Sequence, residues 1–571
     1  MRGKGIQPFP LLLISEDPAR HVWYAPRRIV AWAATDEYPR TFGSQSIFRK
    51  MGRKLYILAG TDAMPDYWLS NSVIHLRIFM AVVTKFRVCR LHLILLFTLC
   101  GACSWSQSLA IKHVTVIDAT GRGPQPNSTV IVEGDRIVAI GSSRKTHIPA
   151  KAVVVDGAGR FLIPGLWDMH VHGASDTRAP WSHLLFLANG VVGVRDMAGP
   201  PDAHAWRAAQ ASDQDPSPTI YLGSPIVDGP NPVWPDSIVV ADEAQGRAVV
   251  DQQQQRGADF IKVYSGLSRD AYFAIADQAN KRGIPFEGHV PEMVTAAEAS
   301  GAGQRSIEHL TRVADSCSKE EKSIDSELQL QETLFRAPGA TMAQKIDAGK
   351  SIIRLNMRTV ETFDDGTAQS LFALFVKNKT WQCPTLTLLR AQIDDPLLAS
   401  DPRLKYLSKD VRAKWDAGYY KNVPPSPRAA IVQLSKLQFD QSLKLVGLMD
   451  RAGVPILAGT DTMNPQCFPG FGLHDELALL VDAGLSPLAA LQAATRNAAQ
   501  FMGQLDHRGT IEVGKTADLV LLDKDPLADI HNTRSVQSVV LGGKLYPRAA
   551  LDAMLAKAQT LASSQGAAAA K

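Results

Sequence analysis

The sequence predicts an α/β protein: a (β/α)8 TIM barrel with a small composite β-sandwich domain formed by segments on both sides of the barrel. Between residues 164 and 505, short apolar segments alternate with helical patterns, which is typical of a parallel barrel. β-Branched segments broken by glycine and aspartate flank this region, at residues 109–163 and 506–549. Histidine, lysine and aspartate residues also stand near the ends of the apolar segments in the middle region.

Length and composition limit the classes of protein to consider. The chain has 571 residues, which predicts more than one domain, and its 45% hydrophobic and 20% charged residues are typical of globular proteins. No basic stripe with interleaved aromatic residues is present, so we expect no nucleic-acid partner. Only three of the six cysteines lie downstream of residue 103, widely spaced, which favours lone buried thiols over a disulfide framework or a cysteine-based zinc site.

Residues 80–108 have the layout of a secretory signal peptide. Lys85, Arg87 and Arg90 precede an apolar run at 91–100, and small residues follow it. The run is too short for a comfortable transmembrane span, although a signal anchor or a buried helix is the alternative. We therefore expect an exported protein, periplasmic or secreted, with no stable membrane insertion after signal cleavage.

Residues 1–79 precede this signal and show no sustained helical or strand period. A signal peptide begins near the true N-terminus of a protein. The sequence therefore predicts a non-native or disordered leader, with Met80 as the natural start.

The two flanking regions are similar in pattern. Residues 109–163 contain "HVTVIDA" and "STVIVEGDRIVAIG", and "GTIEVGKTADLVLLD" follows the middle region at 509–523. Segments 109–163 and 506–549 are therefore expected to build one small sandwich together. The alanine-rich end, residues 550–571, is expected to be a disordered tail.

The middle region, 164–505, contains eight candidate strands separated by helical stretches. The expected strands are Leu166–His172, Gly190–Asp196, Thr219–Gly223, Asp259–Tyr264, Pro285–His289, Arg305–His309, Trp381–Leu386 and Pro455–Asp461. Residues 315–380 are long, charged and helix-prone, which indicates a helical insertion above the barrel mouth. Its charges are explained either by a solvated face or by a substrate lid.

Polar residues follow the expected strands at the end where a TIM barrel carries its active site. His170 and His172 are two apart, so they share one face of a strand. Lys262, His289, His309 and Asp461 stand near the ends of other strands. Each one alone has a structural explanation, but imidazoles and a carboxylate together suit Zn²⁺ or a similar metal. An ammonium group at Lys262 would be costly there unless it were deprotonated or chemically altered.

These residues resemble a known family. "GLWDMHVHG", "FIKVYS", "GHV", "IEHL", "AGTD" and "GKTADLVLLDKDPL" together are similar to the amidohydrolase superfamily, in its imidazolonepropionase-like branch. That branch includes metal-dependent, prolidase-like dipeptidases. The resemblance covers roughly residues 109–549.

The resemblance implies a centre with two divalent metal ions, with Zn²⁺ expected. The implied ligands are His170, His172, Lys262, His289, His309 and Asp461. His170, His172 and Asp461 would bind the more buried ion, and His289 and His309 the second. Lys262 would carry a CO₂-derived carbamate that bridges both ions, which replaces a cation by an anion. Imidazolonepropionase has one metal ion and lacks this lysine, so the presence of Lys262 favours a site with two metal ions.

The resemblance also implies a reaction. A hydroxide shared by the two metals attacks a carbonyl, and Asp461 moves the proton from water to the leaving nitrogen. The expected function is hydrolysis of the amide bond of a small molecule, such as a dipeptide or an N-acyl amino acid. Cyclic amide or lactam hydrolysis and ester or phosphotriester hydrolysis are the alternatives. A non-catalytic scaffold is disfavoured because all six ligand positions are kept; a homo-oligomer is left open.

Other polar residues near the strand ends carry weaker expectations. Tyr264 faces inward beside Lys262, so it is either a substrate-binding donor or a packed aromatic residue. His474 is either a substrate contact or a neighbour of two acidic residues in a first helical turn. Glu287 is a candidate hydrogen-bond partner for a ligand imidazole. Arg195 is expected to form a salt bridge in the interior. The histidines without such context are expected on the surface: His183, His204 and His531.

Overall fold

The computed structural model describes residues 108–211, 215–337, 339–393, 400–416 and 425–568. All of them belong to one of the two compact units of the chain, the one that includes residues 107–571. The predicted leader at 1–79 and the signal peptide at 80–108 lie outside these residues, apart from Ser108, so export stays a prediction. Among the described residues, no helix is long and apolar enough to cross a membrane.

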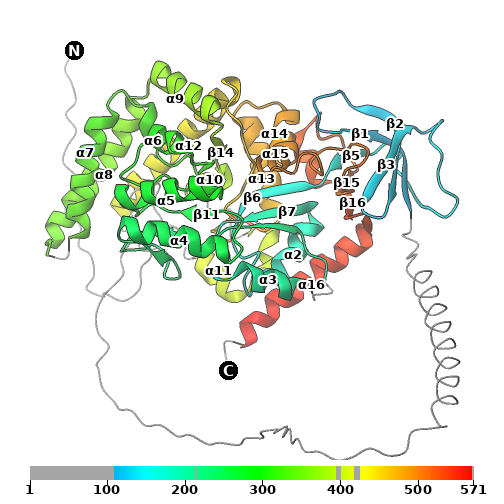
Figure 1. Cartoon of the computed structure of the whole chain (residues 1–571), viewed down its shortest axis with the longest axis horizontal. Helices are drawn as coiled ribbons and strands as arrows, with labels where there is room; N and C mark the ends of the chain where they lie inside the picture. The colour runs from blue at the N-terminus through cyan, green and yellow to red at the C-terminus, as the bar shows by residue number, and fades with distance from the viewer. Residues whose placement is uncertain (1–107, 212–214, 338, 394–399, 417–424, 569–571) are drawn as a thin grey trace, which may run out of the picture. The chain divides into compact units, whose positions relative to one another are not determined.

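Segments from both ends of the described chain combine in one eight-stranded sheet, in the order β17-β16-β15-β5-β1-β2-β3, with β4 beside β1 (Figure 1). Its strands are β1 Leu109–Val116, β2 Gln125–Glu133, β3 Arg136–Ser142, β4 Val153–Asp156, β5 Phe161–Pro164, β15 Leu519–Leu522, β16 Val536–Leu541 and β17 Lys544–Pro547. The antiparallel pair β5–β15 joins the two segments. The predicted combination is thus observed, and the two-layer sandwich stays a prediction.

A close backbone approach holds these two segments together. A Cβ atom added at Gly543, in the β16–β17 turn, would lie 1.8 Å from the carbonyl oxygen of Gly134, in the β2–β3 turn. Both glycines have positive φ angles, 80° and 61°. Glycine adopts this conformation without steric cost, so both turns suit it.

The middle region forms two parallel sheets. The first sheet contains β6 Leu166–Val171, β7 Val191–Asp196 and β8 Thr219–Leu222. The strands of the second sheet lie in the order β10-β9-β11-β12-β13-β14. Their bounds are β9 Val227–Asp228, β10 Ile238–Val239, β11 Ile261–Val263, β12 Phe286–Gly288, β13 Ser306–Glu308 and β14 Trp381–Cys383. Seven of the eight expected strands are therefore present, each parallel to its neighbours.

The eighth expected strand, 455–461, contributes only isolated parallel bridges. Ile456 bridges to Gln382 of β14, and Thr462, one residue beyond the expected strand, bridges to Val171 of β6. Its regularity is broken near Asp461, whose φ of 55° is incompatible with an extended strand. A further parallel bridge, Gly223–Phe260, connects the ends of the two sheets. The ladders themselves remain open, so barrel closure stays a prediction.

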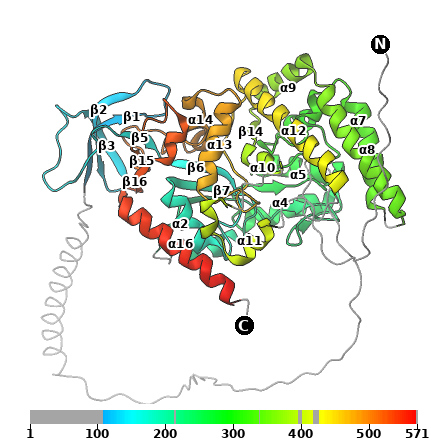
Figure 2. The same ribbon diagram turned by 180° about the vertical axis from the view of Figure 1, so that it is seen from behind.

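Helices follow most of the strands of the middle region (Figures 1 and 2). They are α2 Ala179–Ala188, α3 Ala203–Gln210, α4 Glu243–Gln255, α5 Arg269–Arg282, α6 Ala296–Gly301, α7 Glu321–Arg336, α8 Met342–Glu361, α9 Asp365–Asn378, α10 Leu386–Ala391, α11 Lys409–Asp416, α12 Pro425–Arg451, α13 Phe471–Asp482, α14 Pro487–Ala493, α15 Arg496–Phe501 and α16 Arg548–Ala568. Short 3₁₀ helices lie at Asp315–Cys317, Pro402–Tyr406 and Ile530–Arg534.

The region expected to be a helical insertion, 315–380, is helical. Helices α7 and α8 pack on each other around a small core of their own, with Ile324, Leu328, Ile352 and Leu355 buried. Arg312, in the loop after β13, makes an ion pair with Asp325 of α7 and anchors this hairpin to the end of a sheet strand.

The expectation of a disordered tail at 550–571 is wrong for the described part of it. Residues 548–568 form helix α16, which packs along α2 (Figures 1 and 2). Leu551, Met554, Ala558 and Ala562 are buried at spacings of three and four residues, which is one face of a helix. This apolar face supplies the burial that orders the segment, and alanine favours the helix.

We predict that Leu551→Ala lowers the melting temperature markedly, because Leu551 is fully buried against the body of the protein. Loss of a buried leucine side chain costs about 2–5 kcal/mol. Differential scanning calorimetry measures the effect, with the exposed Gln559→Ala on the same helix as the matched control. Equal melting temperatures for both variants would contradict the docked helix.

Candidate metal centre

The ends of β6 and of the irregular segment 455–461 bring three predicted ligands together. The Asp461 Oδ1 atom lies 3.3 Å from His170 Nε2 and 3.0 Å from His172 Nε2. One ligand atom from each of these residues lies within 4.8 Å of the others, so the group fits a single metal ion. His170 and Asp461 are buried, whereas the side chain of His172 is 22% exposed, which leaves one open side.

His289 and His309 lie beside this group. The ring centroid of His309 is 4.5 Å from that of His170 and 4.9 Å from that of His289. The Nε2 atom of His309 is 3.9 Å from the Oδ2 atom of Asp461. Burial lowers the pKa of both His289 and His309 well below the usual value, and Lys262 acts in the same direction. Both imidazoles are therefore neutral near pH 7, as metal ligation requires.

Lys262 is fully buried on β11, and its Nζ atom has no hydrogen-bond partner among the described residues. Burial lowers the pKa of this amine to about 8, although Glu308 and Asp461 act in the opposite direction. A substantial neutral fraction of the amine near pH 8 is the form that can react with CO₂. The lysine environment therefore fits the predicted carbamate.

The donor atoms fit a bound divalent cation. His170 Nε2, Lys262 Nζ and Asp461 Oδ1 are all buried atoms without a hydrogen-bond partner. Such unsatisfied atoms cost free energy unless another group binds them. Imidazole nitrogens and carboxylate oxygens are ligands that Zn²⁺ and similar metals prefer.

Hydrogen bonds at Nδ1 orient three of the imidazoles. His170 Nδ1 lies 2.7 Å from Glu308 Oε2, His289 Nδ1 lies 2.9 Å from Ser265 Oγ, and His309 Nδ1 lies 2.6 Å from Thr385 Oγ1. The Thr385 hydroxyl donates to the carbonyl of Pro384 and so accepts from His309. Partners of this kind fix the ring orientation and direct Nε2 towards the metal position.

Two of the predicted ligands occupy unusual backbone conformations. His309 and Asp461 have φ angles of 57° and 55°, and Thr385, which supports His309, has a φ of 46°. Such left-handed conformations are uncommon for residues other than glycine and cluster at functional sites, where neighbouring structure enforces them. The turns aim these side chains at one point beyond the sheet.

Tyr264 lies beside the ligand group. Its ring stacks on that of His289 with centroids 3.9 Å apart, and its hydroxyl accepts a hydrogen bond from the Trp234 indole at 3.0 Å. Lys262 Nζ is 5.7 Å from the centre of the same ring. The predicted inward direction of Tyr264 is therefore observed.

The structure does not bring His474 to the ligand group, so its expected substrate contact is wrong. His474 is buried in α13 and its two ring nitrogens lie 3.0 Å from Thr533 Oγ1 and from the carbonyl of Asn189. A side chain engaged at both nitrogens has a structural role. The neighbouring Asp475 pairs with Arg403 and Arg534 rather than with the helix terminus.

The expectation that His183 lies on the surface is also wrong. It is buried in α2 and hydrogen-bonded to the carbonyl of Ala174 at 2.7 Å. His204 and His531 are exposed as expected.

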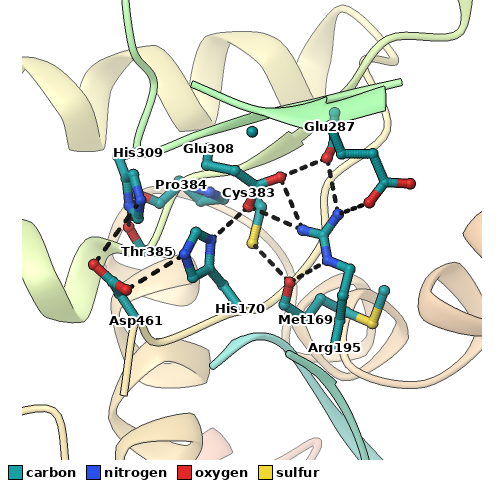
Figure 3. A network of polar contacts seen from close by, with 12 residues as sticks. Met169, His170, Arg195, Glu287, Glu308, His309, Cys383, Pro384, Thr385 and Asp461 are labelled. Carbon is teal, nitrogen blue, oxygen red and sulfur yellow. Dashed lines mark hydrogen bonds and ion pairs between the residues drawn. The ribbon is translucent and has the colours of Figure 1, made fainter. Parts of the chain in front are cut away.

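The interior salt bridge of Arg195 is observed, but Glu287 does not support an imidazole. Arg195 contacts Glu287 at 2.8 Å and Glu308 at 2.9 Å (Figure 3). Glu308, which the sequence analysis did not single out, is the partner of His170. The available signal was an acidic residue immediately before His309, at the end of an expected strand.

The family model described as "Amidohydrolase family" matches residues 161–546. This chain belongs to the amidohydrolase family. Ochratoxinase from Aspergillus niger is 38% identical over 112 residues, 19% of this chain and 22% of that protein. Imidazolonepropionase from Aromatoleum aromaticum is 41% identical over 83 residues, 14% of this chain and 19% of that protein. The chain therefore spans about a fifth of the length of these curated relatives.

Solved structures match over most of the chain. A Xaa-Pro dipeptidase with bound methionine in the active site has a TM-score of 0.54 at 19% identity and covers 77% of this chain and 100% of its own. A bottromycin amidohydrolase has a TM-score of 0.58 at 22% identity and covers 80% of this chain and 90% of its own. At these identities the likeness concerns the fold. The amidohydrolase resemblance of the sequence is confirmed.

We predict that Lys262→Ala lowers the metal content of the purified protein, because a shared ligand is removed. Wild-type protein should contain close to two divalent metal ions per chain, and added short carboxylic acids should restore part of the lost ion in the variant. Elemental analysis after gel filtration measures this, with the exposed Lys281→Ala as control. Equal metal content in wild type and Lys262→Ala would contradict the assignment.

Proposed function

We propose that this protein is a binuclear metal-dependent hydrolase that cleaves an amide C–N bond in a small substrate carrying a free carboxylate, such as a dipeptide or an N-acyl amino acid. The proposal includes closure of the parallel strands as a (β/α)8 barrel. Membership of a family with hydrolase relatives supports the reaction class. The substrate and the number of metals are part of the proposal.

One observation carries the proposal: four imidazoles, a carboxylate and a fully buried lysine converge, and three of their donor atoms lack hydrogen-bond partners. His170, His172 and Asp461 would hold one ion; His289 and His309 would hold the other. Lys262, as a carbamate, would bridge both. Bound divalent cations supply Lewis acidity, which polarises a carbonyl and lowers the pKa of water.

Asp461 is the residue that would move the proton. Burial raises the pKa of its carboxyl, but His170 and His309 outweigh this effect and hold the pKa well below its usual range. The carboxylate is therefore ionised near neutral pH. Its Oδ1 atom faces two imidazoles, and its Oδ2 atom would accept the proton of the attacking water and return it to the leaving nitrogen.

Tyr264 would bind the substrate carboxylate. Its side chain is close to His289 without belonging to the ligand set, and the Trp234 indole fixes the position of its hydroxyl oxygen. A hydroxyl that accepts one hydrogen bond can donate its own hydrogen to a carboxylate. This arrangement favours a substrate with a carboxylate beside the scissile bond.

A cyclic amide is the second candidate substrate. The local similarity to imidazolonepropionase favours it, and the same ligand group would serve. A lactam needs no separate carboxylate contact at the scissile bond. The two candidates therefore differ in the role that they assign to Tyr264.

We expect Asp461→Asn to abolish turnover while the protein keeps much of its metal, because four imidazoles remain but the proton carrier is lost. The loss should appear in kcat rather than mainly in KM. Steady-state kinetics on a panel of dipeptides and N-acyl amino acids, with metal analysis of the same sample, measures both. A near-normal kcat in this variant would assign proton transfer to another group.

For the carboxylate contact, we predict that an N-acyl amino acid exceeds its C-terminal amide in kcat/KM by roughly ten- to a hundredfold, the equivalent of about 1–3 kcal/mol for an unpaired buried donor. Tyr264→Phe should remove most of this preference. The matched control is Tyr221→Phe, at a half-buried tyrosine of β8 that stacks on Phe260. Equal rates on both substrates in wild type would favour the lactam or an ester.

A further inference from the structure

The imidazole of His170 lies between two carboxylates (Figure 3). On one side, its Nε2 atom is 3.3 Å from Asp461 Oδ1; on the other, its Nδ1 atom is 2.7 Å from Glu308 Oε2. An ionised carboxylate only accepts hydrogen bonds, so the Nδ1 atom must carry the hydrogen. In a neutral imidazole this leaves the lone pair on Nε2, which is the atom that faces Asp461.

Glu308 is itself held in place by cationic and hydroxyl donors. The Arg195 guanidinium donates to both carboxylate oxygens at 2.9 Å, and Ser306 donates to Oε1 at 2.5 Å. Arg195 is fixed in turn by the carbonyl of Met169 at 2.6 Å and by Glu287 at 2.8 Å. The carboxylates of Glu287 and Glu308 and the guanidinium of Arg195 are fully buried, so water does not solvate them.

Three donors surround the Glu308 carboxylate: the Arg195 guanidinium, the Ser306 hydroxyl and the Nδ1 atom of His170. The guanidinium is its cationic partner. The Nδ1 atoms of His289 and His309 face hydroxyl groups. The Nδ1 atom of His170 faces a carboxylate.

We propose that Glu308, held by Arg195, is a positioning residue that fixes the His170 imidazole with the Nε2 lone pair directed at the metal centre. The inference concerns the metal centre of the proposed function, but not its substrate. The Arg195–Glu308 pair acts through His170 and does not touch a reacting group. Removal of such a partner weakens metal binding by about ten- to a hundredfold in general.

Glutamine at position 308 is a sharp test of this role. Arg195 needs an acceptor, so the amide oxygen of Gln would face the guanidinium and the amide NH₂ would face His170. The NH₂ group would donate to Nδ1 and so favour the neutral tautomer with its hydrogen on Nε2, a hydrogen that must be lost before Nε2 can bind a metal. The substitution changes one atom and keeps the volume of the side chain.

Glu287→Gln is the matched control. Glu287 is equally buried and contacts the same guanidinium, but it makes no contact with His170. Its Oε2 atom accepts from Arg195, and its Oε1 atom has no hydrogen-bond partner among the described residues. A neutral amide should therefore replace it without reorienting any ligand.

The experiment compares metal-free wild type, Glu308→Gln and Glu287→Gln by competition for Zn²⁺ with a chromophoric chelator. The Co²⁺ absorption spectrum and the melting temperature of the metal-free forms are recorded on the same samples. We expect Glu308→Gln to bind the tightest ion about ten- to a hundredfold more weakly and to change the Co²⁺ spectrum. Glu287→Gln should keep both properties at the wild-type level. Equal losses in both variants, or none in Glu308→Gln, would overturn the proposal.

A second variant covers the case in which Glu308→Gln fails to fold. The triple variant Arg195→Met/Glu287→Gln/Glu308→Leu removes the buried ionic cluster as a whole and leaves His170 Nδ1 without its acceptor; replacing such a cluster by apolar and neutral side chains is often neutral for stability. It should fold and still show the weakened affinity; wild-type affinity in the folded triple variant would overturn the proposal. Wild-type protein that binds no divalent metal would instead refute the proposed metal centre, which keeps the two failures distinct.

Discussion

The fully buried guanidinium of Arg195 is the constraint around which the polar end of the strands is arranged. A buried charge is tolerated only when it is paired and its hydrogen-bonding atoms are satisfied. Arg195 meets this condition by reaching from β7 to acidic side chains on β12 and β13 and to the backbone of β6. The register of four strands is thereby tied to one side chain. An error in strand pairing would leave a charge unpaired in the interior, so the network specifies the alignment on which the ligand positions depend.

The candidate metal centre adds local strain to this frame. The positive φ angles of His309, Thr385 and Asp461 each lie at a point where a strand or its extension ends. These conformations are costly in isolation and persist because adjacent backbone is tightly packed. A Cβ atom at Gly459 would lie 2.5 Å from the sulfur of Cys383 and 2.8 Å from the backbone of His170, which shows how closely the neighbouring segments approach. The ligands therefore stand on a rigid support rather than on a mobile loop.

Sequence reasoning locates features that depend on short-range pattern. Seven parallel strands follow from apolar runs, and the nearness of His170 and His172 to Asp461 follows from their common position at strand ends. It fails where the deciding contact is distant in the chain. Glu308 and His170 are 138 residues apart, so nothing local indicates their hydrogen bond. His474 is similar, because its ring contacts Asn189, 285 residues earlier in the chain, and Thr533, 59 residues later. Helix α16 is ordered because it packs on α2, and an alanine-rich composition alone does not reveal that contact.

The eight-stranded sheet has a consequence for biosynthesis. Strand β5 leaves the peptide exit tunnel some 350 residues before β15, its hydrogen-bonding neighbour, as their positions at Phe161–Pro164 and Leu519–Leu522 require. During translation, the edge of β5 on that side has no native partner until β15 has been made. Unpaired strand edges invite association with other chains. A nascent chain of this architecture must therefore keep that edge protected until β15 has left the exit tunnel.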